Sequence, residues 1–280
     1  MTSQISASRM TLVIEPGRAE RNYWLDLWRY RELMYFLAWR DITVRYRQTA
    51  IGIVWALLRP ALTMLVFIGF RKMAGLPSGG GGPEPILVFA AVLPWQFFST
   101  ALSESSASLI GNTNLISKVY FPRLIIPFAS VITSLVDFAI TLGLLVALMA
   151  WYRYPPSWTI VALPLFTLLA FALSLGLGLF LSALNVEYRD FRYIVPFVVQ
   201  FGLFVSPIAF RTTDVPKRWR AIMAFNPMTG IIDGFRWVIL RGNSPLDVRA
   251  LALSVVVTGA FLILGIWYFR RMERGFADVI

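Results

Sequence analysis

Long apolar runs constrain this chain more than any motif does. The segments at about residues 124–151 and 158–184 are each long enough to cross a bilayer, which takes roughly 20 apolar residues. Hydrophobic residues make up 58% of the 280 residues and charged residues 15%, whereas soluble domains are typically about 45–50% apolar and about 25% charged. The sequence therefore predicts an all-α integral membrane protein with several spans.

The chain changes from a cationic to an apolar character between Arg40 and Trp55. Three arginines fall within eight residues, and a run without charge follows. Cations stay on the cytoplasmic side of a bilayer while apolar residues fill its interior, so this stretch is typical of a helix that lies along the inner face and then enters the membrane. We divide the chain into residues 1–49, a cytoplasmic tail with an interface helix, and residues 50–280, the transmembrane domain.

Residues 22–44 mix aromatic and charged side chains. Their longest apolar run, residues 33–39, is far shorter than a membrane span. We interpret this segment as an amphipathic helix in the membrane interface. The alternative is an ordinary surface helix that packs on a soluble partner, and the two interpretations are compatible.

Six apolar segments are candidates for membrane spans. They cover about residues 50–70, 86–102, 124–151, 158–184, 193–210 and 250–269. The stretch 211–249 is too polar to cross, but its apolar patches at 219–225 and 228–240 predict short re-entrant or periplasmic helices between the last two spans. The arginines that follow the fourth and sixth segments place both termini in the cytoplasm. The connection between the fifth and sixth segments would lie outside the cytoplasm and yet carries several cations. The excess of cations on the cytoplasmic side applies to short loops, and this connection is long.

The residue types that are missing exclude whole classes of function. The chain has no Cys and no His, so it has no disulfide, no thiolate or imidazole metal ligand and no Ser-His-Asp triad. It also lacks the G-x-x-x-x-G-K-[ST] pattern that cradles ATP phosphates. We expect no catalytic residue, no metal site and no cofactor on this chain. The net charge of +11 is better explained by lipid headgroups than by nucleic acid.

Two ionisable residues fall inside the predicted spans. Arg59 precedes Pro60 in the first span, where a lipid-facing arginine costs at least about 2.5 kcal/mol. Arg59 either reaches the cytoplasmic interface or lines a wet cavity. Asp137 in the third span is either a packed hydrogen-bonding group or part of a proton relay, and the first occurs more often.

Aromatic residues gather in the first and fifth spans. They are Trp55 and Phe67 in the first, and Tyr193, Phe197, Phe201 and Phe204 in the fifth. The spacing of Phe197, Phe201 and Phe204 places them on one helical face. Such a face is either packed or lipid-facing, or it provides a stacking surface for sugar rings in a translocation channel.

The ordered series of short motifs resembles one family of transporters. Arg40-Asp41-Ile42, Arg45-Tyr46-Arg47-Gln48-Thr49, Gly52, Trp55 and Pro60 are similar to the start of permeases of the ABC-2 polysaccharide-export family, and residues 184–191 (LNVEYRDF) to its fourth-to-fifth junction. Gln200, Ser206-Pro207-Ile208, Val215-Pro216, Asn226-Pro227-Met228 and Phe235-Arg236 follow in the same order. The pattern is most similar to exporters of lipid-linked O-antigen, with capsule and teichoic acid exporters as neighbours. Arg59 departs from it, because we expect a neutral residue before the proline.

The resemblance implies a homodimeric permease in the bacterial inner membrane, bound to two ATPase subunits that carry ATP and Mg²⁺. The dimer would move an undecaprenyl-diphosphate-linked polysaccharide out of the cytoplasm. The residues that would dock on the ATPase are Gly111, Asn112, Asn114, Leu115, Ser117, Lys118, Tyr120, Glu187 and Arg189. Arg59, with Arg45 and Arg47, is the candidate for meeting the lipid diphosphate, since Arg pairs bidentately with phosphate.

Three other interpretations stay open. The first is an ABC-2 exporter of another substrate, such as a capsule polymer, teichoic acid, drug or lipid. The second is a membrane transferase that acts on lipid-linked sugars, although the absence of His and of clustered carboxylates leaves it few bases. The third is a structural membrane scaffold, whose role would not require an ATPase.

Overall fold

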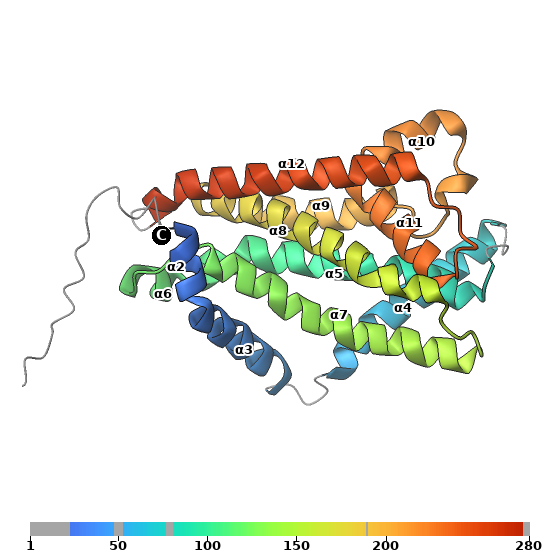
Figure 1. Ribbon diagram of the computed structural model, residues 1–280, viewed down its shortest axis with the longest axis horizontal. Coiled ribbons are helices and arrows are strands. Elements are labelled where there is room, and N and C mark those ends of the chain that lie inside the picture. Colours follow the sequence, from blue (N-terminus) through green and yellow to red (C-terminus); the bar gives the residue numbers. More distant parts are fainter. Residues whose placement is uncertain (1–22, 48–52, 77–80, 189, 277–280) are drawn as a thin grey trace, which may run out of the picture.

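The computed structural model describes residues 23–47, 53–76, 81–188 and 190–276, and the secondary structure in these ranges is entirely helical (Figure 1). The α-helices are α2 (Tyr23–Arg29), α3 (Arg31–Arg47), α4 (Ile53–Met73), α5 (Glu84–Gly111), α6 (Thr113–Lys118), α7 (Ile125–Trp151), α8 (Leu163–Glu187), α9 (Phe191–Val205), α10 (Lys217–Ala224), α11 (Pro227–Ile239) and α12 (Val248–Met272). Short 3₁₀ turns occupy η1 (Trp158–Ala162), η2 (Thr212–Asp214) and η3 (Glu273–Gly275). The predicted tail, residues 1–20, lies outside the described residues.

Five helical segments in the described ranges are long and apolar enough to cross a membrane. They are Val54–Met73, Glu84–Gly111, Ile125–Trp151, Trp158–Glu187 and Val248–Met272. They correspond to five of the six predicted spans, and the all-α fold is confirmed.

The predicted fifth span, residues 193–210, is shorter than expected. Its helix α9 ends at Val205, where Ser206 and Pro207 follow, because proline has no N–H to donate and disfavours helical geometry in the residue before it. The 15 residues of α9 are about 22 Å long, against a hydrocarbon core of about 30 Å. A sixth crossing therefore remains a prediction.

Helix α5 lies at the centre of the bundle and packs against α4, α7, α8, α9 and α11 (Figure 1). Its first turns are completely enclosed, with Ile86 to Leu93 at most 1% exposed. The predicted second span, residues 86–102, was too short, since the helix continues to Gly111. The helix tolerates serines in this part because their hydroxyls are satisfied by carbonyls of the preceding turn, as Ser106 Oγ is by Ser103 O at 2.8 Å.

Helices α8 and α12 approach each other closely at a glycine pair. A Cβ built on Gly265 would lie 2.1 Å from the carbonyl oxygen of Gly176, which is closer than any real contact. Small residues of this kind allow two membrane helices to pack backbone against backbone. The pair places the C-terminal helix directly on α8 (Figure 1).

The predicted interface helix is two helices, α2 and α3, separated at Tyr30. Helix α3 packs on α7 and buries Leu37 and Ala38, while Tyr35, Phe36 and Trp39 are exposed. Its apolar side chains therefore do not form one stripe, as a simple amphipathic helix would require. The interfacial position of this segment remains a prediction.

The connection between α9 and α12 forms helices α10 and α11 at the two predicted apolar patches. Helix α11 is largely buried against α5, α8 and α12. Two fully buried arginines hold the segment after α9: Arg236 donates to the carbonyls of Ile208 and Phe210, and Arg71 donates to that of Ala209, at 2.8–2.9 Å. The carbonyls that follow the helix break are thus satisfied inside the protein.

Candidate functional site

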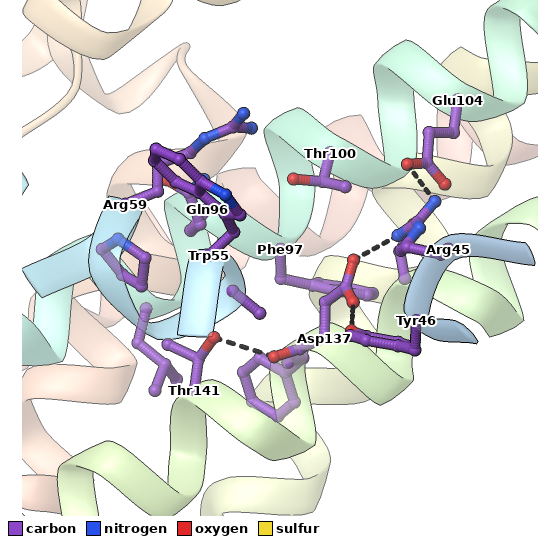
Figure 2. Close-up of a pocket in the computed structure, with 15 residues that line it drawn as sticks. Arg45, Tyr46, Trp55, Arg59, Gln96, Phe97, Thr100, Glu104, Asp137 and Thr141 are labelled. Carbon is purple, nitrogen blue, oxygen red and sulfur yellow. Dashed lines mark hydrogen bonds and ion pairs between the residues drawn. The ribbon is translucent and has the colours of Figure 1, made fainter. Parts of the chain in front are cut away.

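A polar pocket of about 320 Å³ opens between α3, α4, α5 and α7 (Figure 2). The residues that line it are Arg45, Tyr46, Trp55, Ala56, Arg59, Pro60, Leu93, Gln96, Phe97, Thr100, Glu104, Ser134, Asp137, Phe138 and Thr141. Four elements thus bring together side chains that are up to 96 positions apart in the sequence. Four residues singled out by the sequence, Arg45, Trp55, Arg59 and Asp137, meet here.

The end of α3 is fastened to the pocket by charge-assisted hydrogen bonds. Arg45 pairs with both Glu104 of α5 and Asp137 of α7, and the hydroxyl of Tyr46 donates to Asp137 (Figure 2). Each ion-pairing side chain is 22–31% exposed, so the pairs are partly shielded from water. Hydrogen bonds with an ionised partner are about twice as strong as neutral ones. Asp137 therefore acts here as a packed hydrogen-bond acceptor, the first of its two interpretations.

The two α3 residues keep their ordinary charge states in this network. Burial favours a lower pKa for the Arg45 guanidinium, but the hydrogen bonds and charges of Glu104 and Asp137 outweigh it, and its pKa is raised. Burial and the hydrogen bond to Asp137 raise the pKa of the Tyr46 hydroxyl. Arg45 therefore stays a cation, and Tyr46 stays a neutral donor.

Arg59 lies on the other side of the pocket. It comes from α4, next to Trp55, with Gln96 and Thr100 of α5 nearby (Figure 2). Of its two predicted positions, the structure supports the wall of a polar cavity. The pocket holds two arginines and two carboxylates, so an anion that enters it meets the positive charge of Arg59 and competes with Glu104 and Asp137 for Arg45.

The other predicted site residues lie outside this pocket. Arg47 is exposed at the end of α3. Phe67 is 8% exposed and belongs to the hydrophobic core, whereas Trp55 is 57% exposed. The two residues were predicted to share a channel surface, but twelve positions correspond to a rotation of about 120° around a helix of 3.6 residues per turn. Phe67 is therefore not part of an exposed aromatic surface with Trp55.

Helix α9 carries a separate aromatic stripe. Its members are Tyr193, Phe197, Phe201 and Phe204, which are 59–77% exposed. The rings of Phe197 and Phe201 stack, with centroids 6.0 Å apart and an interplanar angle of 9°. The predicted single face is thus present on the surface of the protomer, on a helix that packs against α5 and α8.

The predicted docking segment is mostly helical. Gly111 is the last residue of α5, Asn112 joins the helices, and Thr113–Lys118 forms α6, which lies at the same end of the bundle as α2 (Figure 1). The predicted docking residues Asn114, Ser117, Lys118 and Tyr120 are exposed, and Asn112 and Leu115 are partly exposed. Glu187, at the end of α8, is also exposed and accepts a hydrogen bond from Tyr268 at 3.1 Å. Arg189 lies outside the described residues.

Helix α3 links this docking segment to the pocket. Arg40 donates to the side-chain oxygen of Asn112 at 2.8 Å, and Asn112 donates to the carbonyl of Ser108 at 2.9 Å. Five residues later, Arg45 makes its ion pairs in the pocket. Helix α3 therefore contacts the end of α5 at both the docking segment, through Asn112, and the pocket, through Glu104.

Sequence reasoning missed a partly buried carboxylate beside the docking segment. Glu273 follows α12 and accepts a hydrogen bond from the backbone N–H of Arg123 at 2.6 Å. The Arg270 guanidinium lies 4.6 Å from the centroid of the Tyr23 ring. Burial raises the pKa of Glu273, and the bonds from Arg123 and Tyr23 oppose that rise. No local pattern marks Glu273, because its partners come from α2 and from the segment before α7.

Comparisons with known proteins agree with this architecture. A family model described as "ABC-2 type transporter" matches residues 32–240. The chain is 28% identical to the O-antigen export system permease protein RfbA of Myxococcus xanthus over 91% of this chain and 98% of that protein. It is 24% identical to a Klebsiella pneumoniae protein of the same name (89% and 95%) and 22% identical to the polysialic acid transport protein KpsM of Escherichia coli (84% and 91%).

The family match covers the pocket, the docking segment, the aromatic stripe and helices α10 and α11. The relatives align over nearly their whole length, so the likeness concerns the complete permease rather than one fragment of it. This chain is a multi-pass membrane protein that belongs to the ABC-2 type transporter family.

Proposed function

We propose that this chain is the permease subunit of an ATP-driven exporter that moves a lipid-linked O-antigen polysaccharide across the bacterial inner membrane. The observation that carries the proposal is the full-length likeness to proteins named O-antigen export permeases, in three sequences from two organisms. The permease itself forms and breaks no covalent bond, and the energy comes from ATP hydrolysis with Mg²⁺ on a separate ATPase subunit.

The ATPase docks on the end of the bundle formed by α6 and the end of α8. This surface presents exposed polar side chains on the short helix α6, together with Lys118 and Glu187, which are charges of opposite sign. When the ATPase moves the α6 end of the bundle, the hydrogen bond between Asn112 and Arg40 passes that movement to α3. Two permeases and two ATPases form the complete transporter, with both permease termini in the cytoplasm.

The polysaccharide moves along the aromatic stripe of α9. Sugar rings have apolar faces that slide along aromatic rings, and Tyr193, Phe197, Phe201 and Phe204 offer four rings on one exposed face. A stripe on the surface of one protomer becomes the wall of a channel when a second copy of the chain faces it. The stripe thus accounts for both the substrate class and the homodimer.

The lipid diphosphate is held first at the polar pocket. Arg59 supplies a cation on its wall, and Arg45 supplies a second one when a phosphate displaces its carboxylate partners. Arg47 is exposed and lies outside the pocket, so its contribution is limited to attraction from a distance.

Co-purification with the ATPase encoded beside this chain tests the proposal. We expect a stable complex whose ATP hydrolysis falls when Asn114 and Lys118 are both changed to Ala, whereas changing Arg249, an exposed residue at the start of α12, to Ala leaves it unaltered. A chain that purifies alone and needs no ATPase for its cellular role would favour a scaffold or a transferase.

A second candidate is export of a different polymer by the same mechanism. It is favoured by the likeness to the KpsM proteins over 84% of this chain. Expression in cells that lack their own O-antigen permease or their own capsule permease distinguishes the two. Surface polymer restored only in the capsule-deficient cells would replace the O-antigen assignment.

A further inference from the structure

A second, apolar cavity of about 560 Å³ opens at the opposite end of the bundle from α6. Its lining comes from the last turns of α7, the start of α8 and the segment between them. Figure 1 shows these two helix ends at the end of the bundle away from α6. The residues that line it are Leu142, Leu145, Val146, Met149, Ala150, Arg153, Tyr154, Pro155, Pro156, Ile160, Leu163 and Pro164. Its volume falls within the range of about 300–1,000 Å³ that is usual for ligand pockets. None of the functions proposed above uses it.

Two tryptophans place the cavity at the level of a lipid headgroup. Trp151 ends α7 and is 82% exposed, and Trp158 begins η1 and is 78% exposed. Exposed tryptophans concentrate where a membrane meets water. The cavity thus begins at the interface and continues along α7 toward Leu142, in the direction that an acyl chain takes from its headgroup.

Arg153 lies at the interfacial end of the cavity in a strained backbone conformation. Its φ is +49°, in the left-handed region, and the N–H of Tyr154 bonds the carbonyl of Met149 at 2.8 Å. The left-handed φ and this hydrogen bond are those of a Schellman helix end. Glycine usually occupies the left-handed position, because any other residue costs about 1–2 kcal/mol there. A strained residue of this kind is a reason to look for a function.

The only other non-glycine residue with a positive φ in the described ranges is Arg241, and its role is structural. Its Nε donates to the carbonyl of Pro155 at 2.9 Å, and its guanidinium lies 4.0 Å from the centroid of the Tyr154 ring. Arg241 therefore holds the loop that forms the cavity rim. Within the described ranges, no ion pair or hydrogen bond engages the guanidinium of Arg153.

We propose that this cavity binds an acyl chain of an anionic glycerophospholipid whose phosphate pairs with Arg153. The apolar lining accepts the chain, and a guanidinium matches phosphate geometry bidentately. Arg241 at the rim is engaged by the Pro155 carbonyl and the Tyr154 ring, so Arg153 is the cation that complements the single negative charge of a phosphodiester. A diphosphate carries more charge than Arg153 alone balances. The bound lipid stabilises the antiparallel pair α7–α8. This site is independent of the export function and of the pocket at Arg59.

Two variants test the headgroup and the chain separately. Arg153→Gly removes the cation and suits the left-handed conformation, so the protein should fold at least as well without lipid. Val146→Trp fills the cavity from an exposed position on α7, where a larger side chain does not disturb the core. Arg249→Gln is the matched control, because Arg249 is an exposed cation at the same end of the bundle, on α12 (Figure 1).

The readout is native mass spectrometry of protein purified with equal phosphatidylglycerol and phosphatidylcholine. We expect the original chain and Arg249→Gln to retain one phosphatidylglycerol. Arg153→Gly should lower the ratio of retained phosphatidylglycerol to phosphatidylcholine by about fivefold, the effect of one cation near a membrane surface. Val146→Trp should retain neither lipid.

Two results would overturn the proposal. An unchanged ratio in Arg153→Gly, with unchanged retention in Val146→Trp, would mean that the lipid is annular only. Retention of added undecaprenyl phosphate in preference to phosphatidylglycerol would assign the cavity to an isoprenoid lipid instead. Thermal unfolding in lipid-free detergent checks that both variants are folded.

Discussion

Arg45, at the end of α3, forms an ion pair with Asp137 of α7, which lies 92 positions further along the chain. The same guanidinium pairs with Glu104 of α5. One side chain therefore connects three helices, and it does so on the wall of the polar pocket.

Replacing Asp137 by Asn should destabilise the protein and loosen α3. Asn is too weak an acceptor to hold both Arg45 and Tyr46 as the carboxylate does, and a lost charge-assisted hydrogen bond costs about 1–3 kcal/mol. Thermal unfolding in detergent measures the stability, and hydrogen exchange of α3 measures the loosening. Asp41→Asn is the control, because in the described ranges the ion pair of Asp41 is with the neighbouring Arg40, which is 40% exposed. Equal unfolding midpoints for Asp137→Asn and the original chain would contradict a fastening role.

Replacing Arg59 by Gln should reduce export strongly at a normal protein level. Arg59 lines the pocket and is exposed, so the change removes a cation without unpacking the core. Surface polysaccharide in complemented cells, normalised to permease in the membrane, measures the effect. Arg47→Gln removes an exposed arginine outside the pocket and should reduce export far less. Normal export by Arg59→Gln would remove Arg59 from the proposed diphosphate site.

Replacing Gly265 by Ala should destabilise the bundle by about 1–3 kcal/mol, the usual effect of overpacking. The new Cβ would meet the backbone of Gly176 at 2.1 Å, and a helix backbone cannot move aside as a flexible side chain can. Gly259→Ala, in the same helix, meets nothing within 4 Å and should leave stability unchanged or raise it by up to about 1 kcal/mol through helix propensity. Unfolding midpoints of the two variants check the contrast, and similar values would refute the close approach of α8 and α12.

The stability of the end near α2 should depend on the ionisation of Glu273. Burial raises its folded pKa above the ordinary value of 4.5, so the folded state binds the proton more tightly than the unfolded state. The stability from this group is fully present below pH 4.5 and is lost as the pH rises through the raised pKa. Glutamine does not ionise, so the Glu273→Gln variant does not lose this stability. The difference between the unfolding midpoint of the variant and that of the original chain should therefore increase as the pH rises above 4.5. A constant difference between pH 4.5 and 8 would contradict the raised pKa.

Composition and apolar length predicted the class of protein and most of its spans. The all-α fold and five of the six span positions agree with the structure, because the cost of exposing apolar side chains and unpaired backbone groups acts on each segment separately. The family followed from the ordered motifs between residue 40 and about residue 240, and the family match covers residues 32–240.

Helix ends were predicted less well. The second predicted span ends at residue 102, before a run of serines, but the serine hydroxyls are satisfied by carbonyls of their own helix and α5 continues to Gly111. The apolar residues up to 210 suggested a longer fifth span, but Pro207 ends α9 at Val205. In both cases local hydrogen bonding, rather than hydropathy, decided where the helix ends.

The sequence by itself determined that this chain is a helical membrane permease with cations at its helix ends and rings along one face of α9. Only the tertiary structure decided that Arg45, Glu104, Asp137 and Arg59 surround one pocket, that Phe67 is buried, and that Arg153 lies at the end of an apolar cavity. Hydropathy is a sum over neighbouring residues, and it can be read along the chain. A pocket is made by residues from several helices, and their proximity depends on close contacts such as that between Gly176 and Gly265.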